Sequence, residues 1–174
     1  MTRAIILACG NALRGDDGVA LEIVRRLEGS DLGCETEFYC TQQWTPELAE
    51  TISESDLAVF VDASEVIPAG TIRLEPLAVG DQQSRVTTHS LNAEQLLSLA
   101  RELYTKVPRK AFLLAIGGES FELGGPLSEV AQGVVSRACA EIRALLDARQ
   151  QPTVQLQNPP LSARVSRENL RTGE

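Results

Sequence analysis

The chain has 174 residues, close to the roughly 150 of one domain, and 43% of them are hydrophobic. A chain of this size builds a full core without a metal or disulfide to hold it together. Twenty-four acidic against sixteen basic residues give a net charge of −8, which repels phosphate backbones and anionic lipid. We therefore expect one domain without nucleic-acid or membrane partners.

Targeting and redox signals are also absent from the sequence. The apolar run Ala4–Cys9 is too short for a signal peptide, and no segment is long enough to span a membrane. The four cysteines have irregular spacings without a C-x-x-C pair, which predicts buried free thiols. We expect a cytoplasmic protein with reduced cysteines.

Five segments have the composition of strands. Three of them are unbroken apolar runs, as expected where both faces of a parallel sheet are covered, and a fourth alternates after a turn. The five segments are residues 3–9, 34–40, 56–63, 71–77 and 111–116.

Apolar residues at helical spacing predict helices between these strands. The first helix ends at Gly29, the second opens with Thr45 as N-cap, the third is capped by Ser90, and Ser128 caps a long final helix. This alternation predicts an α/β protein, a three-layer α/β/α sandwich around a mostly parallel five-stranded sheet. In such sheets functional residues gather at the carboxyl ends of the strands.

The composition changes near the end of the chain. Residues 150–174 are rich in Gln, Asn, Pro, Ser and Arg and contain no aromatic residue. We therefore expect a folded domain over residues 1–149, followed by a polar, flexible tail over residues 150–174.

The loop after the first strand, residues 10–18, has the position of a nucleotide-binding turn but not its chemistry. It lacks the G-x-G-x-x-G spacing and a P-loop lysine, and Asp16 and Asp17 would repel a pyrophosphate. We expect Asp16 to cap the following helix and Asp17 to favour its first turn. Only one carboxylate is needed there, which leaves the other free as a metal ligand or acid–base group.

Two further polar residues follow predicted strands or precede a predicted helix. Asp62 ends an apolar run, where a buried charge needs a partner, although an Asx turn over Asp62–Ser64 would also explain it. His89, the only histidine, precedes a helix, although a lone histidine is more often a surface or core residue. Asp17, Asp62 and His89 map to the same sheet edge. Two carboxylates and one imidazole suit Ni(II) or Zn(II) and leave positions open for water or substrate.

Several motifs resemble those of the hydrogenase maturation endopeptidases. The resemblance extends in order from residue 3 to residue 148, and the first motif is specific. The motifs are Gly10-Asn11-x-Leu13-Arg14-Gly15-Asp16-Asp17-Gly18-Val19, Thr45-Pro46-Glu47-Leu48, Asp62-Ala63, Thr88-His89 and Pro126-Leu127-Ser128-x-x-Val.

The resemblance implies a protease that removes the C-terminal extension of a nickel-iron hydrogenase large-subunit precursor after nickel insertion. The family's metal-binding positions fall on Asp17, Asp62 and His89, and the family has been classed as aspartic-type. We expect these residues to bind nickel that the precursor supplies, and we expect the protease to be a monomer. Two alternatives remain open: a non-catalytic nickel-checking chaperone, and a metal-dependent small-molecule hydrolase.

The chain also departs from the family's pattern. Residues 41–44 replace a glycine-rich stretch that many members carry after the second strand, and some members have Glu in place of Asp17. The Q-x-T-P-E-L variant is similar to a subgroup that serves cytoplasmic, cofactor-reducing hydrogenases. A shorter ligand arm is expected at Asp17.

Overall fold

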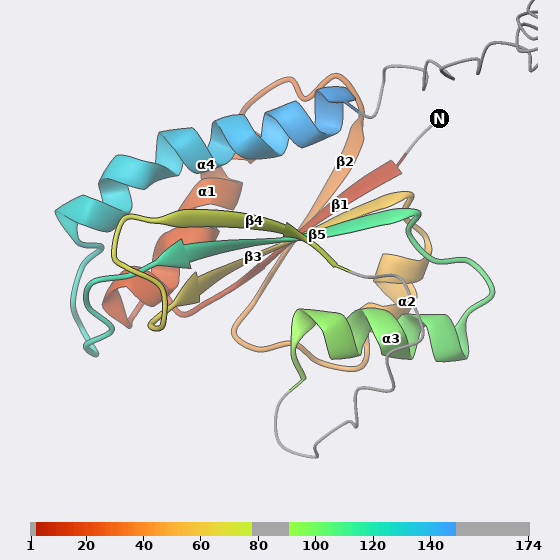
Figure 1. Ribbon diagram of the computed structural model, residues 1–174, viewed down its shortest axis with the longest axis horizontal. Helices are drawn as coiled ribbons and strands as arrows, with labels where there is room; N and C mark the ends of the chain where they lie inside the picture. Colours follow the sequence, from red (N-terminus) through yellow and green to blue (C-terminus); the bar gives the residue numbers. More distant parts are fainter. Residues whose placement is uncertain (1–2, 78–90, 149–174) are drawn as a thin grey trace, which may run out of the picture.

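The computed structural model describes residues 3–77 and 91–148, in which strands alternate with helices (Figure 1). The strands are β1 (Arg3–Cys9), β2 (Glu35–Thr41), β3 (Leu57–Ser64), β4 (Ile72–Pro76) and β5 (Lys110–Gly117). The helices are α1 (Val19–Glu28), α2 (Leu48–Ser53), α3 (Ala93–Leu103) and α4 (Glu129–Ala148), and a 3₁₀ turn, η1 (Gly15–Gly18), precedes α1. All five predicted strands are confirmed within one or two residues at each end.

The strands form one sheet in the order β2-β1-β3-β5-β4. β1 pairs in parallel with β2 and β3, and β3 pairs in parallel with β5, whereas β4 is antiparallel to β5. Helical connections return the chain to the start of each parallel strand, while the short turn at Pro68–Gly70 reverses it into β4. The parallel strands therefore all deliver their carboxyl ends to one edge.

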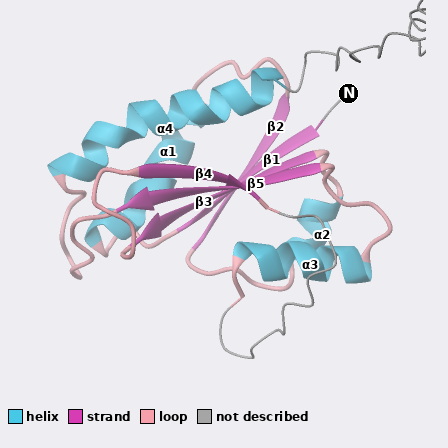
Figure 2. Ribbon diagram, viewed as in Figure 1, coloured by secondary structure: helices cyan, strands magenta, loops and turns pink. Residues whose placement is uncertain are grey.

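Helices cover both faces of the sheet (Figure 2). α1 and α4 pack on one face, and α2 and α3 pack on the other, each pair enclosing its own cluster of buried apolar residues. This confirms the predicted three-layer α/β/α sandwich. It follows from strands without a polar face, because both of their surfaces must be removed from water.

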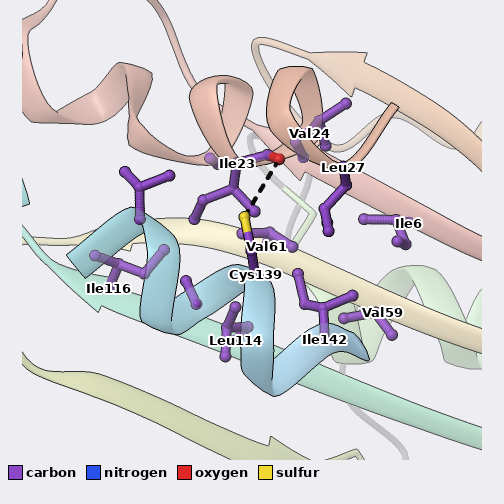
Figure 3. Packing of buried hydrophobic residues seen from close by; sticks show 14 of the residues in the cluster. Ile6, Ile23, Val24, Leu27, Val59, Val61, Leu114, Ile116, Cys139 and Ile142 are labelled. Carbon is purple, nitrogen blue, oxygen red and sulfur yellow. Dashed lines mark hydrogen bonds between the residues drawn. The ribbon is translucent and has the colours of Figure 1, made fainter. Parts of the chain in front are cut away.

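The face under α1 and α4 is packed with aliphatic side chains (Figure 3). Ile23 and Leu27 of α1 meet Ile142 of α4 over the sheet, and all three are fully buried. The Cys139 thiol donates to the Ile23 carbonyl oxygen at 3.8 Å and so joins the two helices. This layer behaves as an ordinary close-packed core.

The helix caps differ from the prediction at three of four positions. α1 has no side-chain cap, and α2 begins only at Leu48, so neither Asp16 nor Thr45 caps a helix. α3 is capped by Asn92, in a reciprocal capping box with Gln95, and Ser90 lies outside the described residues. The prediction for Ser128 is confirmed, since its hydroxyl accepts from the Ala131 N–H at 3.0 Å.

The cysteines and the chain ends give mixed outcomes. All four thiols are free, but only Cys9 and Cys139 are buried. Cys34 is half-buried and Cys40 is exposed, so the prediction of burial is wrong for these two.

Among the helices in the described ranges, none is long and apolar enough to cross a membrane. The predicted tail, residues 150–174, lies outside the described residues.

Candidate functional site

The loops that leave β1 and β5 are joined by main-chain hydrogen bonds at the carboxyl edge of the sheet. The N–H of Gly15 donates to the Gly125 carbonyl at 3.2 Å, and the N–H of Asp16 donates to the Ser120 carbonyl at 2.8 Å. The N–H of Gly124 donates to the Leu13 carbonyl at 2.6 Å. The loop that carries both candidate aspartates is therefore fixed to the loop between β5 and α4.

Two glycines permit this close approach. A Cβ on Gly10 would lie 1.9 Å from the Asp17 carbonyl oxygen, and one on Gly15 would lie 2.5 Å from the Ser120 carbonyl oxygen. Gly15 also has a φ of +54°, a conformation that residues with a side chain rarely adopt. Both glycines of the G-N-x-L-R-G-D-D motif are therefore required by the geometry of the loop.

Asp16 is the structural carboxylate of the pair. It is fully buried, and its oxygens accept from the N–H groups of Glu119 (2.7 Å), Ser120 (3.2 Å) and Ser128 (2.7 Å) and from the Ser128 hydroxyl (2.8 Å). Burial by itself would raise the pKa of Asp16, but these hydrogen bonds to the ionised form outweigh it and lower the pKa below its usual range. The expectation that Asp16 caps α1 is wrong; it anchors the β5–α4 loop and the start of α4 instead.

Asp17 has a different environment from its neighbour. Its side chain is half-buried in η1, and one carboxylate oxygen accepts from the Asn11 N–H at 2.8 Å. Its charge raises the pKa values of both Asp62 and Cys9, which places its carboxylate within electrostatic reach of the ends of β3 and β1. The structure thus brings Asp17 and Asp62 to the same site, as the sequence predicts.

Asp62 lies in β3, two residues before the strand ends. Side chains alternate along a strand, so Asp62 shares the α2/α3 face of the sheet with Phe60. Burial first, and then the charge of Asp17, raise the pKa of Asp62 to about 6, although donors from the Ala63 backbone and Trp44 oppose the shift. Since β3 continues to Ser64, the alternative of an Asx turn at Asp62 is wrong. A carboxylate with a pKa near neutrality is suited to accept a proton.

Cys9 is the neighbour of Asp62 on the adjacent strand. The β1–β3 register pairs Ala8 with Val61, so Cys9 and Asp62 follow side by side at the ends of the two strands. Burial, followed by the charges of Asp62 and Asp17, raises the pKa of Cys9 to about 12. The thiol is therefore protonated at neutral pH and is not a nucleophile in this site.

Trp44 is the residue of this site to which sequence analysis gave no role. It is 8% exposed, its ring packs edge-on against Phe60 at 5.4 Å between centroids, and its indole opposes the rise in the pKa of Asp62. Its backbone also forms an antiparallel bridge with Leu91. The available signal was that Trp44 is the only tryptophan of the chain and lies in a loop after a strand.

The chain is similar to known proteins by its structure rather than by a sequence profile. No sequence profile of a known family matches the chain, and no curated protein matches it. Solved structures do match. The hydrogenase maturating endopeptidase HybD from E. coli superposes with a TM-score of 0.70 and 22% identity, over 86% of this chain and 94% of that one.

Two archaeal structures agree with this match. The [NiFe] hydrogenase maturation protease HycI from Thermococcus kodakarensis gives a TM-score of 0.66 and 23% identity, over 84% of this chain and 93% of that one. The hydrogenase 2 maturation peptidase from a Thaumarchaeota archaeon gives 0.64 and 24%, over 84% of this chain and 99% of that one. The chain has the fold of the hydrogenase maturation endopeptidases.

Two of the three predicted metal ligands lie in the described part of this maturation-endopeptidase fold. Asp17 and Asp62 meet at the carboxyl edge, whereas His89, the third predicted ligand, lies outside the described residues. In the ranges 3–77 and 91–148, no three His, Cys, Asp or Glu side chains are grouped so that they could hold a metal ion. The set of Asp17, Asp62 and His89 therefore stays a prediction.

Proposed function

We propose that the protein is a cytoplasmic endopeptidase that removes the C-terminal extension of a nickel-iron hydrogenase large-subunit precursor after nickel insertion. The observation that carries this proposal is the carboxylate pair of Asp17 and Asp62 at the edge of a fold shared with three proteins named as hydrogenase maturation peptidases. The free cysteines fit a reducing compartment. We propose that the enzyme acts as a monomer on this one protein partner.

The nickel of the precursor belongs to the substrate in this proposal. Two carboxylates and an imidazole are a donor set that suits a borderline divalent ion, so Asp17, Asp62 and His89 would bind the nickel that the precursor presents. A precursor without nickel offers nothing for this set to bind, which would leave it uncut.

The proposed chemistry uses Asp62 as the base. Without a metal, the pKa of Asp62 is about 6, so the carboxylate is largely ionised at neutral pH. In this proposal one of its oxygens binds the nickel and the other takes a proton from water. The water oxygen then adds to the scissile carbonyl carbon. The carbon–nitrogen bond breaks as Asp62 returns its proton to the leaving amine, which releases the extension as a peptide. Placing the bond beside Asp62 by means of the bound nickel supplies the required orientation.

Incubation with nickel-loaded precursor, followed by intact mass spectrometry, tests this function. Loss of one C-terminal peptide from the precursor supports the proposal. A stable complex without cleavage would instead identify a nickel-checking chaperone. If the precursor is neither cut nor bound, a small-molecule hydrolase becomes the better hypothesis. Nickel-free precursor is the matched control and is expected to remain intact.

A second experiment tests where the metal comes from. Three ligands without cysteine should bind free ions weakly compared with a closed four-ligand site, so the purified protein should be largely metal-free. Treating it with a chelator and then removing the chelator should leave processing of nickel-loaded precursor unchanged. Stoichiometric nickel or zinc in the purified protein, with processing lost on its removal, would contradict the substrate-metal mechanism and indicate a resident catalytic metal.

A further inference from the structure

The loop that carries Asp17 closes on itself through a cycle of three hydrogen bonds. The Asn11 N–H donates to the carboxylate oxygen Oδ2 of Asp17 at 2.8 Å, and the Asp17 N–H donates to the Arg14 carbonyl at 3.1 Å. The Arg14 N–H completes the cycle by donating to the Asn11 carbonyl at 2.9 Å. Because one acceptor in the cycle is the Asp17 side chain, the cycle fixes that carboxylate against the backbone of its own loop.

The Asn11 side chain holds the first corner of this cycle. Its Oδ1 accepts from the Leu13 N–H at 2.9 Å, in the Asx turn that asparagine commonly forms in tight loops. The preceding N–H, of Gly10, donates to the Thr41 carbonyl at the end of β2 at 2.9 Å. Residues 12–14 are exposed, so no core packing would replace the turn if the Asn11 oxygen were removed.

The two oxygens of the Asp17 carboxylate have different surroundings. Oδ2 accepts from Asn11, whereas no group in the ranges 3–77 and 91–148 donates to Oδ1. A carboxylate has acceptor sites on both oxygens. One oxygen of Asp17 is therefore committed to the loop, and the other remains available to a ligand.

We propose that Asn11 is a positioning residue that holds the Asp17 carboxylate with Oδ2 on the loop and leaves Oδ1 for the nickel of the precursor. This inference rests on the proposed function and adds to it a residue and an oxygen atom that the metal-ligand prediction does not specify. Asn11 acts through Asp17, because the Asx turn keeps the Asn11 N–H aimed at Oδ2. Hydrogen bonds that orient a metal-ligating side chain typically contribute about tenfold to hundredfold to metal affinity or activity.

Three substitutions separate positioning from a purely structural role. Asn11→Ala removes the acceptor for the Leu13 N–H, and kcat/KM for nickel-loaded precursor should fall about tenfold to hundredfold. Asn11→Ser keeps a hydroxyl acceptor for the same turn and should recover to within about fivefold of the wild type. Asp31→Ala is the matched control, because Asp31 Oδ1 accepts from the Gly33 N–H at 2.9 Å in the loop between α1 and β2, at the opposite edge of the sheet. This control should lower the melting temperature as much as Asn11→Ala does, by a few degrees, without loss of processing.

The contact has a readout that is independent of proteolysis. The chain has four asparagines, so labelling their backbone nitrogens with ¹⁵N gives few amide signals, and the one absent from Asn11→Ser is that of Asn11. Asp17→Ala removes the charged acceptor and should move this signal upfield. Asp17→Asn should leave it nearly in place, because the amide oxygen still accepts, yet processing should be lost because the amide nitrogen then takes the place of Oδ1. Asp31→Ala should not move the signal.

Each outcome decides a separate point. Wild-type processing by Asn11→Ala would show that Asn11 only shapes the loop and would overturn the inference. A loss in Asn11→Ser as large as in Asn11→Ala, or an Asn11 signal indifferent to Asp17→Ala, would overturn it as well. If the wild-type chain leaves nickel-loaded precursor uncut, the proposed function fails and the role of Asn11 in processing fails with it, while the amide signal still decides whether Asn11 holds Asp17.

Discussion

Two aspartates at the carboxyl edge of the sheet, one on the side of each helix pair, have opposite environments. Under α1 and α4 the edge ends in Asp16, whose oxygens accept four hydrogen bonds and whose pKa is lowered. On the α2/α3 face it ends in Asp62, which is half-buried, has fewer donors and has a pKa raised to about 6. Removing a carboxylate from water thus has two results, because the surrounding donors decide whether the ionised form is stabilised.

This difference separates a structural region from a reactive one. The donors around Asp16 tie the β5–α4 loop and the start of α4 to the first loop, so its charge contributes to the fold. Asp62 is instead partly removed from water beside the charge of Asp17, an arrangement that costs stability and provides a basic group. Sites that are costly in this sense are commonly functional.

The largest effect should come from the reactive side. Asp17→Asn, Asp62→Asn and His89→Ala should each lower processing of nickel-loaded precursor by at least about 100-fold while the fold is retained, since each removes a proposed ligand or base. Intact mass spectrometry measures the processing, and circular dichroism measures the fold. Normal cleavage by two of the three variants would refute the site assignment.

On the structural side, Asp16→Ala should lower the free energy of unfolding by about 3–5 kcal/mol, because it leaves three partly buried N–H groups and a hydroxyl without their charged acceptor. Urea unfolding measures this change. Glu119→Ala is the control, since the exposed side chain is removed while the N–H that donates to Asp16 remains. A loss below about 1 kcal/mol for Asp16→Ala would mean that the loops hold together without it.

The pH dependence of stability should distinguish the two carboxylates by sign. The pKa of Asp62 rises from 3.8 to about 6 on folding, so its ionisation opposes folding and stability should fall by about 2 kcal/mol as pH rises from about 4 to 6. The pKa of Asp16 is lowered on folding, so its contribution is lost only as pH falls below the usual range of aspartate.

Comparing wild type with Asp62→Asn isolates the first contribution. Thermal unfolding across the pH range should show that this variant lacks the decline between pH 4 and 6 and is more stable than wild type at pH 7. Identical pH profiles for the two proteins would show that the fold does not perturb Asp62.

The smallest effect is expected outside both regions. Ending the chain after residue 149 should change the melting temperature by no more than a few degrees, because residues 150–174 lack the apolar side chains to form a core. Differential scanning calorimetry of the full and shortened chains measures this directly. A drop of more than about 10 °C would place a stabilising contact in the tail.

The sequence alone determined the strands, the layers and the edge at which function gathers. Unbroken apolar runs such as Leu57–Val61 have no polar face, so helices must cover both sides, and parallel connections must then bring the loops after β1 and β3 together. Asp17 and Asp62 could be predicted as neighbours for this reason. Ser128 was equally predictable, since a cap acts on its own helix.

Tertiary structure decided the contacts between residues far apart in the chain. Local sequence predicts Asp16 as a helix cap, yet its donors come from residues more than 100 positions away, which no periodicity reveals. The same holds for Trp44, whose ring packs on Phe60 of β3 although no motif predicts that contact. Patterns in sequence report burial and local geometry, whereas the partner of a buried polar group is fixed only when separate loops meet.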